Sequence, residues 1–245
     1  MRLKKFKFGY TLPVRIMGKV YRFLIDTGAQ KSIIKADVVN CCVLPLQVNP
    51  QEISNSMKQK MVVSYSCSVP ISIENDFTET VNMLVLNKSF VFNGLKCQGI
   101  LGTDVLCRLD FKLSFKNNRF DILRVNEEAS DPFFSLFING KKCTAIIDTA
   151  ASNSWICENS ILCKDCDYHV RPVLFFSIDS VRLQLVKIYK RVSMDTGNYK
   201  AMIQNVHVGR SVSRKGHAID IVLGRDVLKR AVLMFVNSSY VIIPV

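Results

Sequence analysis

The sequence predicts an all-β protein made of two similar lobes, related by a pseudo-two-fold axis and each carrying one short helix. Three observations support this prediction: period-2 alternation of apolar residues, an internal repeat that spans both halves, and little helical periodicity. The 245 residues, 49% of them hydrophobic, are enough to bury a sizeable core.

Residues 61–73 (MVVSYSCSVPISI) show the clearest strand pattern. Every odd position is apolar, and the even positions are mostly serine. This alternation predicts a strand with one buried face, and Pro70 predicts an edge or a bulge at its position. Helical patterns are confined to TDVLCR (103–108) and RDVLKR (225–230).

Two blocks of sequence recur at one offset. IMGKVYRFLIDTGAQ (16–30) is echoed by INGKKCTAIIDTAAS (138–152), so that Asp148 follows Asp26 by 122 positions. GILGTDVL (99–106) is echoed by IVLGRDVL (221–228), again 122 positions on. Two blocks that share one offset indicate a duplication, and they give Asp26 a partner carboxylate in Asp148.

The polar segment NEEASDP (126–132) is the predicted linker between a first lobe of residues 1–125 and a second lobe of residues 133–245. Because the linker is short, the lobes are expected to stay together. The strand-like segments RFDILRV (119–125) and YVIIPV (240–245) are expected to pair in a sheet that both lobes share.

The repeated blocks resemble the motifs of retropepsin and pepsin aspartic proteases. The shared features are Asp-Thr-Gly-Ala at 26–29 after two apolar residues, an apolar pair before Gly102 and Gly224, and the short helix of GRDVL. In addition, DTAASNSW (148–155) is similar to the pepsin stretch Asp-Thr-Gly-Ser-Ser-Asn-Leu-Trp. The resemblance covers nearly the whole chain and implies two retropepsin-like β-barrel lobes in tandem, equivalent to a dimer in a single chain.

This resemblance implies an aspartic endopeptidase in which Asp26 and Asp148 activate a water molecule, with no metal or cofactor. Two adjacent carboxylates cannot both ionise easily, so one stays protonated over a broad acidic range, and either Asp can take either role. The implied supporting residues are Thr27, Gly28, Thr149 and Ala150 in the Asp loops, Leu101, Gly102, Leu223 and Gly224 packed beneath them, and Asn55, Ser56, Met57, Asp179 and Ser180 in two flaps.

Two departures from the family pattern bear on activity. Ala150 stands where the family has glycine, and its methyl group strains the loop if φ is positive there. Neither predicted flap, EISNSMKQK (52–60) or FFSIDSVRL (175–183), contains glycine. The sequence therefore leaves open a catalytically weak or inactive pseudoprotease that serves as a peptide-binding module.

A third departure concerns the contacts that brace the loops. Many retropepsins pair the arginine of the GRD helix with an aspartate two residues after the motif glycine. Here the corresponding positions hold Gln30 and Thr103 in the first half, and Ser152 and Arg225 in the second. Another contact is therefore expected to brace the Asp loops.

The spacing of the cysteines and histidines does not indicate a further catalytic or metal site. Nine cysteines without the spacing of a disulfide framework are expected to be reduced. Cys157, Cys163, Cys166 and His169 are a possible zinc ligand set, but their spacing matches no known zinc module, and buried or surface thiols are the favoured interpretation. Trp155 is expected in the core, and His207 and His217 are expected at the surface.

Charge and composition indicate which kinds of partner the protein binds. The formal net charge is +13, but no nucleic-acid-binding motif accompanies it, so we expect a polypeptide substrate rather than a nucleic acid. No apolar run is long enough to cross a membrane, and the basic start lacks the apolar stretch of a signal peptide. The duplication predicts a monomer, and the lack of a signal peptide predicts a location inside the cell or in a virus particle. The resemblance to retroviral and retrotransposon proteases implies polyprotein processing as the role.

Overall fold

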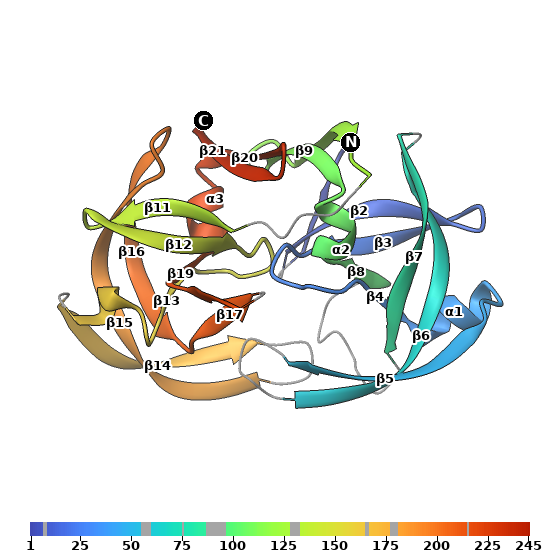
Figure 1. Ribbon diagram of the computed structural model, residues 1–245, viewed down its shortest axis with the longest axis horizontal. Helices are drawn as coiled ribbons and strands as arrows, with labels where there is room; N and C mark the ends of the chain where they lie inside the picture. The colour runs from blue at the N-terminus through green and yellow to red at the C-terminus, as the bar shows by residue number, and fades with distance from the viewer. Residues whose placement is uncertain are drawn as a thin grey trace.

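The computed structural model of the protein describes residues 1–6, 9–54, 60–74, 76–86, 97–127, 133–164, 167–176, 181–214 and 216–245. Strands make up most of these residues, and the helical segments are short, so the prediction of an all-β fold is confirmed. Figure 1 shows two strand-rich halves side by side, with a smaller sheet across the end that carries both termini.

The described part of the first half contributes eight strands to one sheet: β1 (Lys4–Phe6), β2 (Gly9–Ile16), β3 (Lys19–Ile25), β4 (Ile33–Lys35), β5 (Leu46–Ser54), β6 (Lys60–Ile73), β7 (Phe77–Leu86) and β8 (Gly99–Leu101). Their order is β1-β2-β3-β8-β4-β7-β6-β5. The short strand β8 lies parallel to β3, and β4 lies parallel to β7. These parallel pairs bring the ends of β3 and β8 together, where the first Asp loop begins.

Strand β6 shows the predicted alternation from Cys67 to Ile73, but not around Tyr65, which is exposed next to a buried Ser66. Cys67, Val69, Ile71 and Ile73 are buried at alternate positions, because this face packs on the core. Pro70 lies between the residues that pair with β5, which end at Cys67, and those that pair with β2, which begin at Ile71. The proline therefore sits at a local edge on this side of β6, while on the other side it pairs with Thr80 of β7.

The first half has one helix more than expected. Among the described residues, two of the three α-helices are those of the repeated blocks, α2 (Thr103–Leu106) and α3 (Arg225–Leu228). The other, α1 (Ala36–Cys41), buries Val38 and Val39 against the sheet. Six residues are too few to show helical periodicity, so the expectation of one helix per lobe is wrong for the first half. The second half also contains a 3-10 turn, η1 (Ile161–Lys164).

The second half, where it is described, contributes seven strands to another sheet: β11 (Phe134–Ile138), β12 (Lys141–Ile147), β13 (Trp155–Cys157), β14 (Tyr168–Phe176), β15 (Val181–Asp195), β16 (Lys200–Gly209) and β19 (Ile221–Leu223). Their order is β11-β12-β19-β13-β16-β15-β14. β3, β4, β8 and α2 recur 122 positions later as β12, β13, β19 and α3. A separate hairpin joins β17 (Val212–Arg214) to β18 (His217–Ile219).

A third sheet combines the two halves. Its strands are β9 (Leu109–Ser114), β10 (Arg119–Val125), β20 (Ala231–Val236) and β21 (Ser239–Pro244), in the order β10-β9-β20-β21. The expected shared sheet is present, but the expected pairing of 119–125 with 240–245 is wrong, because these strands form its two outer edges. The central pair is β9 with β20, and Phe111 packs there on Phe120 and Phe235 with ring centroids 5.1 and 5.8 Å apart.

The two halves share one apolar core. A single cluster of buried side chains includes Leu12 and Phe23 from the first half and Ile147 and Leu223 from the second. Burial of apolar area is the main stabilising contribution to such a fold, so the halves support each other. Of the predicted linker, residues 128–132 lie outside the described residues. Among the described residues, no helix is long and apolar enough to span a membrane.

Candidate active site

The first Asp loop starts where β3 ends. Asp26 directly follows this strand, and its backbone N–H donates to the carbonyl of Leu101 at the end of β8, at 3.1 Å. The chain then turns back, so that the N–H groups of Gly28 and Ala29 donate to Asp26 Oδ1 at 2.9 and 3.0 Å. The carboxylate is therefore fixed by its own loop, and only one of its oxygens is used in these two bonds.

The second Asp loop repeats this geometry at the end of β12. The backbone N–H of Asp148 donates to the carbonyl of Leu223 at 3.0 Å. The N–H groups of Ala150 and Ala151 donate to Asp148 Oδ1 at 2.9 and 2.8 Å. Replacement of glycine by Ala150 therefore preserves the N–H that holds the carboxylate.

Thr27 and Thr149 tie the two loops to each other. The Thr27 hydroxyl donates to the carbonyl of Ile147 at 2.8 Å and accepts the Thr149 N–H at 3.1 Å. Reciprocally, the Thr149 hydroxyl donates to the carbonyl of Ile25 at 2.7 Å and accepts the Thr27 N–H at 3.1 Å. Both threonines are buried, so these four hydrogen bonds are shielded from water and fix the loops face to face.

Gly28 and Ala150 occupy equivalent places but meet different surroundings. A Cβ added at Gly28 would lie 2.5 Å from Cγ of Asp148, so the glycine leaves the room that this carboxylate fills. Ala150 is not among the residues with positive φ, so its methyl group strains no backbone. It packs instead against an apolar cluster of the first half that includes Leu24 and Ile100.

The pKa values of both carboxyl groups are raised. Burial is the main cause for Asp26, and the charge of Asp148 adds to it, raising the pKa of Asp26 to about 7. Burial also raises the pKa of Asp148, against the backbone N–H donors of its loop and the charges of Arg214 and Arg225. The pair therefore keeps a proton in the acidic range, where an isolated aspartate is already ionised.

Two Ser–Asp pairs brace the Asp loops in place of the missing Arg–Asp pairs. Ser32 donates from its backbone N–H and its hydroxyl to Asp104 at 2.9 and 2.6 Å, and the same hydroxyl accepts the Gly102 N–H at 3.0 Å. Ser154 makes the same contacts with Asp226, at 2.9 and 2.7 Å. The sequence holds the signal for these braces, because each residue recurs at the 122-residue offset.

Gly102 and Gly224 allow these braces to form beneath the loops. A Cβ at Gly102 would lie 2.8 Å from the Lys31 backbone, and one at Gly224 would lie 2.6 Å from the Asn153 backbone. Leu101 and Leu223 next to them are fully buried. The four residues thus form the close-packed support under the two Asp loops.

Of the four positions where the Arg–Asp pair is missing, three make loop contacts of their own. Arg225 donates through Nη2 to the Ser152 hydroxyl at 3.0 Å and through Nε to the carbonyl of Ala151 at 3.2 Å. In the first half, the Thr103 hydroxyl donates to the carbonyl of Ala29 at 3.3 Å. The fourth position, Gln30, is exposed. At these equivalent positions the two loops therefore differ in charge, because Arg225 in the second half corresponds to the neutral Thr103 in the first.

Arg214 is a contact of the first Asp loop that the sequence does not reveal. It lies on the β17–β18 hairpin of the second half, and its guanidinium donates to the carbonyls of Thr27 and Gly28. The position 122 residues earlier holds Phe92, so the internal repeat gives no hint of a cation here.

The predicted flap residues Asn55, Ser56, Met57, Asp179 and Ser180 lie outside the described residues. The adjoining parts of β5 and β6 are described. Ile53 and Met61 pack against the same apolar cluster as Ala29 and Ala150. The ends of β5 and β6 therefore pack on the apolar cluster that also carries Ala29 and Ala150 of the Asp loops.

The remaining candidates of the sequence are the cysteines, Trp155 and two histidines. All eight described cysteines are free thiols, and six of them are buried. Cys166 lies outside the described residues, and the described residues contain no group of three metal-ligating side chains. Trp155 is half-buried and packs beside Gly209. His217 is exposed as expected, but His207 is buried, because β16 lies inside the sheet.

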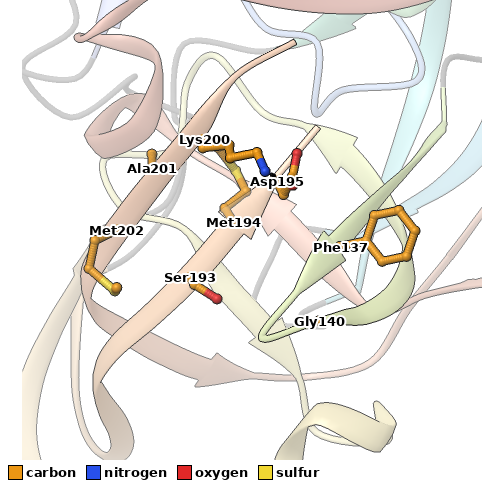
Figure 2. A pocket seen from close by; sticks show the side chains of 8 residues that line it. All are labelled: Phe137, Gly140, Ser193, Met194, Asp195, Lys200, Ala201 and Met202. Atoms are coloured by element: carbon orange, nitrogen blue, oxygen red, sulfur yellow. Dashed lines mark ion pairs between the residues drawn. The ribbon is translucent and has the colours of Figure 1, made fainter. Parts of the chain in front are cut away.

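A hollow of about 650 Å³ lies away from the Asp loops. Figure 2 shows its lining on β11, β15, β16 and the turn at Gly140, with an ion pair of 3.0 Å between Lys200 and Asp195, which lie opposite each other on β16 and β15. Asp26 and Asp148 do not contribute to its lining. The hollow therefore has no contact with the paired carboxylates.

Comparison with known proteins agrees with this geometry. Residues 12–108 match the family of gag-polyprotein putative aspartyl proteases. The match contains the Asp26 loop, Leu101, Gly102 and α2, and it supports a retropepsin-like aspartic protease domain in the first half of the chain. A search of the curated proteins finds no match.

Proposed function

We propose that the protein is an aspartic endopeptidase whose single chain supplies both catalytic carboxylates. In this proposal, residues 1–125 and 133–245 are two retropepsin-like lobes that arose by duplication. The observation that carries it is the reciprocal set of hydrogen bonds between Thr27 and Thr149, which holds Asp26 and Asp148 face to face. A self-contained pair of this kind needs no second chain.

The two carboxylates differ in their charged neighbours, and this difference supports distinct roles. The charge of Arg225 acts on Asp148, whereas Thr103 takes the equivalent place in the first half. A nearby cation stabilises the ionised form of a carboxylate. We therefore assign the negative charge to Asp148 and the proton to Asp26 in the free protein.

Hydrolysis then follows from this protonation state. Asp148 takes a proton from a water held between the carboxylates, and the water oxygen attacks the carbonyl carbon of the peptide bond. Asp26 gives its proton to the carbonyl oxygen, which forms a neutral diol. The diol collapses as the proton held by Asp148 passes to the leaving nitrogen, the C–N bond breaks, and a hydroxyl proton of the diol returns to Asp26.

The proposed substrate is an extended polypeptide. The ends of β5 and β6 pack through Ile53 and Met61 on the apolar cluster that also carries Ala29 and Ala150 of the Asp loops. A substrate strand beside these loops can pair with β5 or β6 by backbone hydrogen bonds. The family match to gag-polyprotein proteases supports polyprotein processing as the biological role.

The proposal is tested by digestion of a diverse peptide library between about pH 3.5 and 7, with the products read by mass spectrometry. We expect cuts at defined positions, most frequent at acidic pH, because the raised pKa values keep one proton on the pair there. If the folded protein makes no cut at any pH and still binds library peptides, the binding-module alternative is correct and the proposal is wrong.

A further inference from the structure

Arg214 is a buried cation at the end of strand β17. Only 3% of its surface is exposed, although its charge is expensive to remove from water. Its Nη2 donates to the carbonyl of Gly28 at 2.5 Å and to that of Thr27 at 3.2 Å. Both acceptors belong to the first Asp loop, whereas Arg214 itself comes from the second half of the chain.

The contact lies on the backbone segment that fixes Asp26. The peptide unit that begins with the Thr27 carbonyl ends with the Gly28 N–H, which donates to Asp26 Oδ1. The next peptide unit begins with the Gly28 carbonyl and ends with the Ala29 N–H, which donates to the same oxygen. Charge-assisted hydrogen bonds to both carbonyls therefore fix the orientation of the two peptide units that hold the carboxylate.

The charge of Arg214 also reaches both carboxylates. It lowers the pKa of Asp26 and of Asp148, in opposition to burial. The other cation that acts on the pair is Arg225, which also faces Tyr10 of β2. Among the described residues, the cations that act on the pair thus come from the second half.

We propose that Arg214 is a positioning residue for the carboxylate pair: it holds the Thr27 and Gly28 carbonyls so that Asp26 keeps its orientation, and it places a fixed positive charge beside the pair. The catalytic effect of Arg214 rests on the proposed function. The hydrogen bonds by which Arg214 fixes the first Asp loop do not depend on that function. Arg214 acts on the pair through these two loop carbonyls and through its charge.

The test compares three variants with the wild-type chain. Arg214→Met removes the charge and the donors, and Arg214→Lys keeps the charge but loses the planar fork. Arg210→Met, four residues earlier at an exposed position, is the control that removes one positive charge. Amide hydrogen exchange over residues 23–31 reports on the loop, and the pH dependence of kcat/KM for a library peptide reports on the pair.

We expect Arg214→Met to speed exchange at Gly28 and Ala29 by about tenfold or more, because those N–H groups lose their fixed orientation. It should lower kcat/KM by about tenfold or more and move both limbs of the pH profile upward by about 0.5 to 1 unit, since a cation that favours ionisation is gone. Arg214→Lys should keep the pH limbs and show intermediate exchange. Arg210→Met should match the wild type in both readouts.

The proposal is wrong if the amide hydrogens of residues 23–31 exchange in Arg214→Met at the wild-type rate. It is also wrong if the pH profile of kcat/KM in that variant is not shifted. If Arg214→Met does not fold, wild-type exchange in Arg214→Lys overturns it instead. If the wild-type protein cuts no peptide, the proposed function fails, and the exchange experiment alone decides whether Arg214 positions the loop.

Discussion

Replacement of Asp26 by Asn should lower kcat/KM for peptide cleavage by at least about 1,000-fold and leave the fold intact. The amide keeps an Oδ1 that accepts the N–H bonds of Gly28 and Ala29, so the loop loses no contact. It cannot supply the proton that the carbonyl oxygen takes up, and general acid–base groups contribute about 100- to 10,000-fold to such reactions. Asp148→Asn should have an equally large effect, because it removes the base.

The measurement is the initial rate of cleavage of the best library peptide, with circular dichroism to verify the fold. Asp195→Asn is a matched control, because Asp195 lies in the outer hollow and pairs with Lys200. This control should cut within about twofold of the wild-type rate, since surface ion pairs contribute little. Residual cleavage above about one tenth of wild type in Asp26→Asn contradicts the proposed role of this carboxylate.

Replacement of Gly28 by Ala should lower kcat/KM by about 100-fold or more. The new Cβ would lie 2.5 Å from Cγ and 2.6 Å from Oδ2 of Asp148, so that carboxylate must move. A displacement of about 1 Å in a catalytic group is enough for a loss of this size. The effect is steric, because φ at Gly28 is not in the positive range.

The reverse change at the equivalent position is the control for this prediction. Ala150→Gly removes a methyl group that packs against the apolar cluster of the first half, and it relieves no backbone strain. We expect activity within about fivefold of wild type and a stability loss on the order of 1 kcal/mol. Equal activity of Gly28→Ala and Ala150→Gly would show that the crowding at Gly28 does not matter for the reaction.

The parts of the site that could be predicted from the sequence are the residues that occur in both copies of the repeated blocks. Asp26 and Asp148, with Thr27 and Thr149, stand out because one offset relates both blocks. The same offset relates Ser32 to Ser154 and Asp104 to Asp226. These braces could have been found, but a serine or an aspartate on its own carries no signal for a buried hydrogen bond.

Other features depend on three-dimensional contacts that no local pattern shows. Arg214 has no cationic counterpart in the repeat, and its acceptors are backbone carbonyls about 186 residues away in sequence. The pairing of β9 with β20 follows from aromatic packing around Phe111 and not from the strand ends at 119–125 and 240–245. Helix α1 is too short to show periodicity.

The most direct measurement of the raised pKa that burial and the charge of Asp148 give to Asp26 is the stability of the wild type and Asp26→Asn at two pH values. An unfolded aspartate ionises near about pH 4, whereas the folded pKa of Asp26 is raised to about 7. Between these values the folded state binds more protons than the unfolded state, so wild-type stability falls as the pH rises through this range. The Asp26→Asn variant lacks the part of this loss that comes from Asp26, because its amide does not titrate, and it keeps the part that comes from Asp148.

We therefore expect urea unfolding to show Asp26→Asn more stable than the wild type at about pH 7.5, by about 1 to 3 kcal/mol, and nearly equal to it at about pH 4. This result requires no substrate and no activity. A stability difference that is the same at both pH values would mean that Asp26 titrates as an isolated aspartate. It would contradict the carboxylate pair on which the proposed function rests.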